Sequence, residues 1–169
     1  MREHTIRARY EFSFNALTTA FWSRFPNALQ KHIVYAEVID RSLDVQAGVL
    51  KTTRLLTVDA LQDAPKALQF LLGRAAHSYT IEISTVDAKR QVAHIESQNL
   101  SYRNLFDAYS MTEYRAVAAN ETLLTGSMRT LGLTYFRDRI EHALEPKLHA
   151  NAQAGVEALE AACRRAGAK

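Results

Sequence analysis

Period-two alternation of apolar and polar residues, repeated along most of the chain, is the feature that most restricts the fold. At residues 6–12, the letters Ile-Arg-Ala-Arg-Tyr-Glu-Phe place apolar side chains on one face of a strand and charged ones on the other. Similar strands are predicted at 33–41, 49–58, 78–87, 91–100, 107–116 and 121–131. Because short connections join these segments in order, they are expected to form an antiparallel sheet of about seven strands.

Apolar positions recur at helical spacing in residues 17–25, directly after the first predicted strand. Ser13 or Asn15 has the side-chain oxygen that caps the N-terminus of a helix. Pro26 cannot continue a helix, so the helix is expected to end just before it. The sequence therefore predicts one helix between the first two strands.

Two further helices are predicted, a short one at residues 65–72 and a long one at residues 133–165, which Pro146 is expected to kink. No repeat, low-complexity segment or linker interrupts the chain, and 169 residues suit one core. The prediction is one α+β domain over residues 1–169, with a curved antiparallel sheet and a long C-terminal helix across it.

Composition and charge exclude several classes of protein. Hydrophobic residues make up 47% and charged residues 23%, and the longest apolar run is far below the ~18 residues of a membrane span. The net charge of +3 favours anionic surfaces, but without a block of Lys and Arg it does not predict nucleic-acid binding. The N-terminus has no apolar segment typical of a secretory signal.

Four polar residues interrupt apolar stripes. Arg24 shares the apolar face of the first predicted helix, and Arg54 alternates in phase with the apolar residues of its strand. Lys147 and Asn151 continue an apolar stripe of the last helix. All four side chains are therefore predicted to point inward.

An inward cation needs a partner, because burying an unpaired charge is costly. The partner could be a protein carboxylate, such as Asp40 or Glu82, or the anionic group of a ligand. The first possibility makes each cation a structural ion pair, and convergence of three cations would favour the second.

Several short motifs occur in an order that is found in a known family. They are Phe-Trp-Ser-Arg-Phe-Pro-Asn at 21–27, Lys-His-Ile at 31–33, Leu-Lys-Thr-Thr-Arg-Leu-Leu at 50–56, Ile-Ser-Thr-Val-Asp at 83–87, Asn-Leu at 99–100 and Thr-Glu-Tyr at 112–114. This ordered set resembles the PRELI/MSF1 family of mitochondrial phospholipid-transfer proteins. The likeness runs from about residue 10 to 115 and continues weakly through the last helix.

The resemblance implies a fold and a function. In the family, an antiparallel sheet and helices enclose a lipid-sized cavity, which agrees with the strand pattern above. Known members work in the mitochondrial intermembrane space, where they move phosphatidic acid or phosphatidylserine between membranes. They pair with a small helical protein that carries twin Cys-x9-Cys motifs. The resemblance thus implies a phospholipid ligand, transient contact with an anionic membrane surface, and neither enzymatic activity, cofactor nor metal.

The resemblance also assigns candidate lipid-binding residues. Arg24 and His32 match family positions near the lipid phosphate, and Lys147 and Asn151 match cavity positions on the last helix. Arg54 joins them as the inward cation of the Thr-Arg-Leu-Leu strand. A guanidinium can hold a phosphate through two charge-assisted hydrogen bonds.

Two departures bear on the headgroup. Family members that carry phosphatidic acid often have Lys at the positions of Thr57 and Ala154. The motifs at 21–27 and 31–33 nevertheless look more like the phosphatidic acid branch. Phosphatidic acid is therefore predicted, with phosphatidylserine as the alternative.

The segment 65–73 resembles the flexible lid loop of the family. Its apolar residues are expected to cover the cavity and touch the bilayer on docking, although they could simply cover the core. They are Leu68, Phe70, Leu71 and Leu72.

Two rival functions stay open at this point. His32 with Asp40 or Glu37 could form an acid–base pair of a small-molecule enzyme, although the chain has no nucleophile elbow, glycine-rich phosphate loop or metal motif. Cys163 precedes two arginines that could lower the pKa of its thiol, but an inert helix cysteine is the simpler interpretation. The second rival is a scaffold that binds a protein partner and no lipid.

Overall fold

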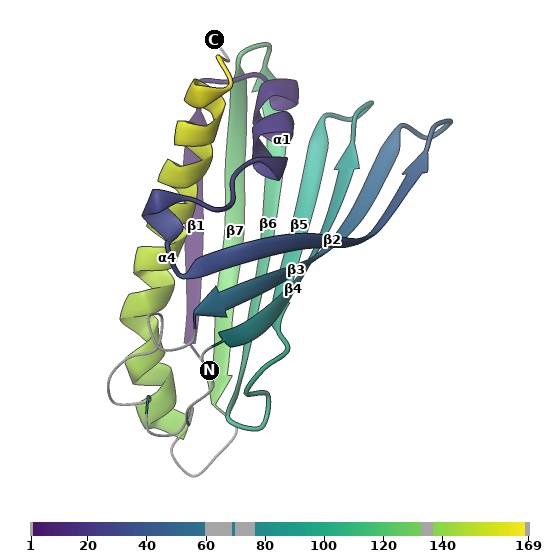
Figure 1. Ribbon diagram of the computed structural model, residues 1–169. Helices are drawn as coiled ribbons and strands as arrows, with labels where there is room; N and C mark the ends of the chain where they lie inside the picture. The colour runs from purple at the N-terminus through teal and green to yellow at the C-terminus, as the bar shows by residue number, and fades with distance from the viewer. Residues whose placement is uncertain (1, 60–68, 70–76, 133–136, 168–169) are drawn as a thin grey trace.

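The sheet is the dominant element of the computed structural model, which describes residues 2–59, 69, 77–132 and 137–167. Its seven strands are all antiparallel and run in the order β1-β7-β6-β5-β4-β3-β2 (Figure 1). The predicted architecture is therefore confirmed. The strands are β1 (Arg2–Tyr10), β2 (Ile33–Asp44), β3 (Val49–Asp59), β4 (His77–Asp87), β5 (Val92–Asn99), β6 (Phe106–Ala118) and β7 (Glu121–Gly132).

The first strand lies a few residues earlier than the alternation predicted. β1 pairs with β7 in continuous register, from Arg2 opposite Thr130 to Tyr10 opposite Thr122. This hydrogen-bonded partner extends the strand toward the N-terminus, where the residue pattern alone gave no signal. At its other end, the strand stops at Tyr10, three residues before Ser13, the N-cap of the next helix.

Helix α1 (Phe14–Trp22) begins where the sequence predicted but ends earlier. The Ser13 hydroxyl accepts a hydrogen bond from the Ala16 N–H at 3.2 Å, so Ser13 is the cap. The predicted helix extended to Phe25. A residue before proline is disfavoured in helical conformation, which accounts for the earlier end and places Arg24 in the turn after the helix.

A single 3-10 turn, η1 (Ala28–Gln30), follows this turn and was not predicted. The Asn27 side chain caps it by accepting a hydrogen bond from the Leu29 N–H at 2.8 Å. Asn27 also donates from its amide to the Ala158 carbonyl at 3.4 Å. Because Ala158 belongs to the last helix, η1 is fastened to that helix.

The last helix, α4 (Arg137–Arg165), lies across one face of the sheet and packs against β1, β7, α1 and η1 (Figure 1). Near its start, the Glu141 carboxylate accepts hydrogen bonds from the Gly132 N–H and from Arg137, both at 3.1 Å. The bond from Gly132 attaches the beginning of α4 to the end of β7, whereas the bond from Arg137 lies within the first turn of α4. No helix among the described residues has the length and apolar character needed to cross a membrane.

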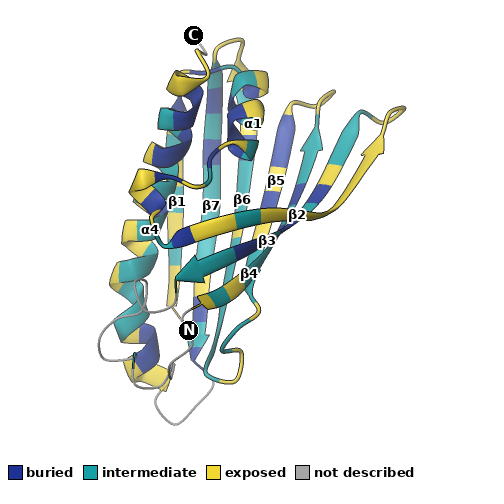
Figure 2. Ribbon diagram, viewed as in Figure 1, coloured by how far each residue is buried: buried dark blue, intermediate teal, exposed yellow. Residues whose placement is uncertain are grey.

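The hydrophobic core lies between α1, the C-terminal half of α4 and the central strands, as Figure 2 shows. Its large buried side chains come from all three elements. They include Phe14, Leu17 and Phe21 of α1, Tyr114 and Leu124 of the sheet, and Leu159 of α4. The core thus packs against only the C-terminal half of the helix. The middle of α4, from about Leu144 to Val156, lines a cavity against the sheet.

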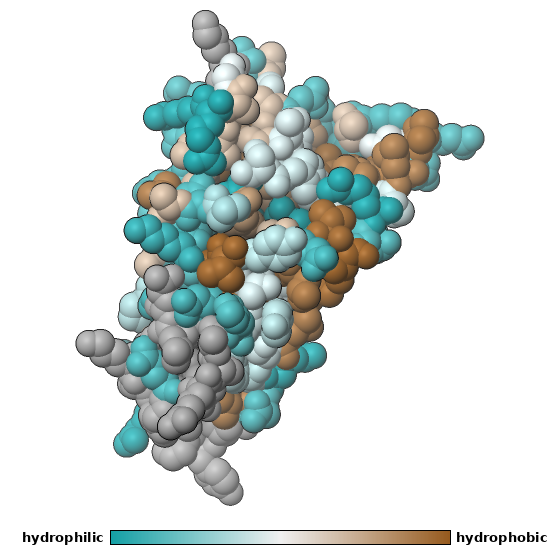
Figure 3. Space-filling model, viewed as in Figure 1, coloured by the Kyte–Doolittle hydropathy of each residue, from teal (hydrophilic) through white to brown (hydrophobic). Residues whose placement is uncertain are grey.

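Strand β2 forms one edge of the sheet and is exposed along most of its length. Several of its side chains are large and apolar, and Figure 3 shows apolar patches over this region of the molecule. The exposed apolar residues of the strand are Val34, Tyr35, Val38, Ile39 and Leu43. This edge differs from β1, which α4 packs against.

The substitution Leu159→Ala should destabilise the fold by about 2–5 kcal/mol, because the removed side chain is fully buried between α4 and α1. The measurement is the free energy of unfolding in urea. Gln153→Ala, on the exposed face of the same helix, is the control and should cost less than about 1 kcal/mol. Equal effects of the two changes would contradict the assignment of the core.

Candidate ligand-binding cavity

A cavity of about 330 Å³ occupies the space between the middle of α4, η1 and the sheet. This volume is at the lower end of the ~300–1,000 Å³ typical of small-molecule sites. Its apolar lining comes from several strands and from α4, and includes Ile6, Leu56, Val58, Leu124, Leu148 and Val156. The cavity therefore offers an apolar environment to a ligand that enters it.

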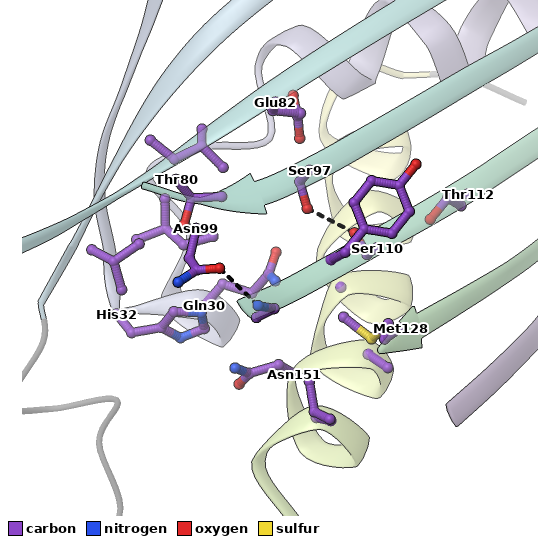
Figure 4. Close-up of a pocket in the computed structure, with 18 of the residues that line it drawn as sticks. Gln30, His32, Thr80, Glu82, Ser97, Asn99, Ser110, Thr112, Met128 and Asn151 are labelled. Carbon is purple, nitrogen blue, oxygen red and sulfur yellow. Dashed lines mark hydrogen bonds between the residues drawn. The ribbon is translucent and has the colours of Figure 1, made fainter. Parts of the chain in front are cut away.

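Polar side chains line another part of the cavity, on β5 and β6 (Figure 4). The Ser97 and Ser110 hydroxyls are hydrogen bonded to each other at 2.7 Å. Asn99 accepts from the Ala108 N–H at 2.7 Å and donates to the Phe106 carbonyl at 3.0 Å. These bonds hold the two strands together at the cavity wall.

Four of the predicted site residues line this one cavity, although they are far apart in the sequence. Arg24 comes from the turn after α1 and His32 from the turn before β2, whereas Lys147 and Asn151 come from α4. Figure 4 shows His32 and Asn151 among the side chains around the cavity. Of the three inward cations that the sequence predicted, Arg24 and Lys147 line the cavity.

The fifth predicted residue, Arg54, is not among the described lining residues. It lies opposite Glu82 in the β3–β4 register, and its guanidinium donates two hydrogen bonds to Glu82 Oε1, at 2.8 and 2.6 Å. Only 2% of Arg54 and 3% of Glu82 are exposed. This geometry favours the structural ion pair, and a lipid-binding role for Arg54 stays a prediction.

Arg24 shares the same carboxylate. Its Nη2 lies 3.3 Å from Glu82 Oε2, and its guanidinium stacks 4.5 Å from the ring centroid of Phe21 and 4.4 Å from that of Phe25. Arg54 stacks over Phe21 as well, at 4.6 Å. The three charged groups therefore form a buried cluster beneath aromatic rings from α1 and the following turn.

One carboxylate between two guanidinium groups leaves a net positive charge at the cavity wall. Burial lowers the pKa of Arg54, and Glu82 opposes that shift by favouring the charged form. Within the described chain, no group accepts a hydrogen bond from the buried Nε of Arg24. Arg24 thus combines a structural ion pair with donor capacity at the cavity.

The sequence analysis missed the polar residues on β5 and the amide of Gln30. A signal existed for the first group, because Ile95, Ser97 and Asn99 occupy alternate positions and so share one face of β5. Gln30 lies in a single turn with no periodicity, so nothing in the sequence indicated that it is buried.

The predicted lid residues Leu68, Phe70, Leu71 and Leu72 lie outside the described residues, and their role stays a prediction. Over residues 2–59, 77–132 and 137–167, no group of three or more His, Cys, Asp or Glu side chains is arranged to hold a metal ion.

Other proteins share the arrangement of one antiparallel sheet and a long C-terminal helix. Protein TTHA0849 from Thermus thermophilus superposes with a TM-score of 0.65 over 98% of this chain and 99% of its own, at 11% identity. A norcoclaurine synthase from Thalictrum flavum superposes with a TM-score of 0.52 over 98% of this chain and 96% of its own, at 12% identity. At such low identity the likeness concerns the α+β fold alone.

The family model of the PRELI-like family matches residues 15–169, and the chain belongs to this family. Protein UPS2, mitochondrial, of Saccharomyces cerevisiae is 34% identical over 119 residues, which are 68% of this chain and 51% of the relative. Protein UPS1, mitochondrial, of the same yeast is 26% identical over 68% of this chain and 63% of the relative. The slowmo homolog of Dictyostelium discoideum is 26% identical over 72% of this chain and 53% of the relative. The chain thus spans about half the length of UPS2 and of the slowmo homolog.

The substitution Glu82→Gln should destabilise the protein by about 3–5 kcal/mol, because it leaves two buried guanidinium groups without a counter-charge. Unfolding in urea measures the change. Glu113→Gln serves as the matched control, because Glu113 pairs with Arg115 at the surface and should contribute less than about 1 kcal/mol. A stable Glu82→Gln protein would show that the cluster is not needed for folding.

Cys163 should react far more slowly with a thiol reagent in the native protein than in urea. Its side chain is fully buried, and burial raises the pKa of the thiol to about 11, so very little thiolate is present at neutral pH. The following Arg164 is engaged by Glu160 at 2.6 Å and does not lower that pKa. The measurement is the labelling rate at pH 8. Fast labelling of the native protein would show that Cys163 is reactive and would contradict the effect assigned to burial.

Proposed function

We propose that this chain binds one molecule of an anionic phospholipid in its cavity and transfers it between membranes without chemical change. The observation that carries the proposal is the cavity itself, which combines apolar walls with the cations Arg24 and Lys147 and with His32. An acyl chain suits the apolar walls, and a phosphate suits the cations.

The positions of these cations support a headgroup site. Arg24 is fixed by its ion pair with Glu82 and by stacking on Phe21 and Phe25, so its guanidinium is held in place before a ligand arrives. Lys147 contributes a second charge to the cavity lining, from α4. A phosphate between them would compensate the excess positive charge of the cavity wall.

The predicted headgroup is phosphatidic acid, and phosphatidylserine is the alternative within the same family. Two lysines that are typical of phosphatidic acid carriers are absent at Thr57 and Ala154. Membership of the PRELI-like family supports a phospholipid ligand for both alternatives.

An enzymatic function is less well supported by the cavity. Glu82 is a carboxylate of its lining, but both of its oxygens are engaged by the guanidinium groups of Arg24 and Arg54. The partners that the sequence offered to His32, Asp40 and Glu37, are not among the described lining residues. Norcoclaurine synthase shares the fold, so the fold itself does not distinguish a carrier from an enzyme.

The proposed location is the mitochondrial intermembrane space, and the proposed partner is a small helical protein with twin Cys-x9-Cys motifs. The names of UPS1 and UPS2 include the word mitochondrial, which supports the location. The exposed apolar side chains of β2 support a requirement for a protein partner, because a large apolar surface is unfavourable in water. Contact with an anionic membrane surface is proposed to be transient.

The substitution Lys147→Glu should lower transfer of fluorescent phosphatidic acid or phosphatidylserine between liposomes at least tenfold, because it places a negative charge against the lipid phosphate. The matched control is Arg139→Glu, which makes the same charge change on the exposed surface of α4 and should alter transfer much less. Circular dichroism checks that both proteins are folded.

The two variants separate headgroup recognition from general attraction to membranes. If Arg139→Glu reduces transfer as much as Lys147→Glu, the effect comes from docking to the anionic surface, and the headgroup site is wrong. If the wild-type chain transfers neither lipid, the proposed function is wrong.

A further inference from the structure

Gln30 carries a buried hydrogen-bonding group at the cavity that the protein itself does not use. Only 6% of the residue is exposed, and it belongs to the cavity lining. No described residue donates a hydrogen bond to its side-chain oxygen, Oε1. Buried carbonyl oxygens are rarely left without a donor, so an unused one at a cavity indicates a missing partner.

The position of this amide is fixed by the surrounding backbone. The Gln30 N–H donates to the Asn27 carbonyl at 3.1 Å, and Asn27 is bonded to the Ala158 carbonyl of α4. The Gln30 Nε2 atom lies 3.6 Å from the point where a Cβ on Gly155 would be. The side chain is therefore packed closely against the α4 backbone, and Figure 4 shows it together with His32, Asn99 and Asn151.

The neighbouring polar groups do not supply the missing donor. The Asn99 amide donates to the Ser101 and Phe106 carbonyls, at 2.8 and 3.0 Å. The Ser97 and Ser110 hydroxyls are bonded to each other. No other described residue donates to Gln30 Oε1 either, so a molecule that enters the cavity can supply the donor.

We propose that Gln30 determines headgroup specificity by accepting a hydrogen bond from a hydroxyl or ammonium group of the bound phospholipid. This inference rests on the proposed function and specifies the ligand further. The preferred ligand is a phosphodiester whose phosphate meets the cations and whose headgroup carries an O–H or N–H donor. Phosphatidylserine and phosphatidylglycerol have this chemistry.

Phosphatidic acid fits the amide less well. A phosphate monoester has a second pKa of about 6, so at neutral pH it is mostly a dianion without a proton to donate. Its charge would suit Arg24 and Lys147, but the Gln30 oxygen would stay without a donor. Gln30 thus favours the serine alternative over the predicted phosphatidic acid.

Pairs of lipids that differ only in the donor test the proposal in a liposome transfer assay with the full 169-residue chain. Phosphatidylglycerol and phosphatidylmethanol carry the same charge, but only the first has headgroup hydroxyls. Phosphatidylethanolamine and phosphatidylcholine are both zwitterions, but only the first has N–H donors. The wild-type chain should prefer the donor-bearing lipid of at least one pair by roughly five- to tenfold. The pair that shows the preference identifies the donor as hydroxyl or ammonium.

Gln30→Met keeps the length of the side chain and removes the acceptor, so it should reduce that preference to about one. Gln98→Met makes the same change on β5, where the side chain alternates with the cavity-lining Ser97 and Asn99, and should keep the preference. Gln30→Glu retains an acceptor and should keep it as well. The readout is a ratio between two lipids, which a general loss of stability does not change.

The outcomes distinguish a failure of the Gln30 role from a failure of the proposed function. Equal transfer of both lipids in each pair by the wild-type chain overturns the role of Gln30 and leaves the proposed function intact, and this result does not depend on whether a variant folds. An unchanged preference in Gln30→Met also overturns it. Failure of the wild-type chain to transfer any phospholipid overturns the proposed function and, with it, the headgroup specificity.

Discussion

The buried ion pair between Arg54 and Glu82 is the interaction on which much of the site depends. It links β3 to β4, on the side of the sheet that ends in the edge strand β2, and it provides the carboxylate that fixes Arg24. Without this carboxylate, the turn after α1 would have to bury a guanidinium group with no counter-charge. The position of the cation at the cavity therefore follows from an interaction whose first purpose is structural.

Aromatic rings complete this arrangement. Phe21 stacks on both guanidinium groups and also belongs to the hydrophobic core, so the charged cluster and the core share a side chain. Burial raises the pKa of the adjacent Tyr114, and the Arg24 guanidinium partly offsets the rise. Charge and apolar packing are thus coupled where the core meets the cavity.

The strands and the long helix could be predicted from the sequence because their periodicities are direct consequences of backbone geometry. The cavity-facing position of Lys147 could be predicted for the same reason, because a residue's place in a helical stripe determines the face on which it lies. Arg24 is buried as predicted, but it lies in the turn after α1, so the helical stripe does not explain its direction. The partner of each cation could not be predicted, because Asp40 and Glu82 were equally available until the β3–β4 register placed Glu82 opposite Arg54. Gln30 was missed because a single 3-10 turn produces no repeating pattern.

The attachment of α4 at its two ends has a consequence for how the protein tolerates a guest molecule. One end is fixed by core packing around Leu159, and the other by the hydrogen bond from the Gly132 N–H of β7 to Glu141, whereas the middle faces the cavity. Occupancy of the space beneath the middle of the helix requires neither attachment to break. The loaded and empty forms can therefore share one backbone scaffold, and the residues beneath the helix can vary between relatives without altering the contacts that keep the chain folded.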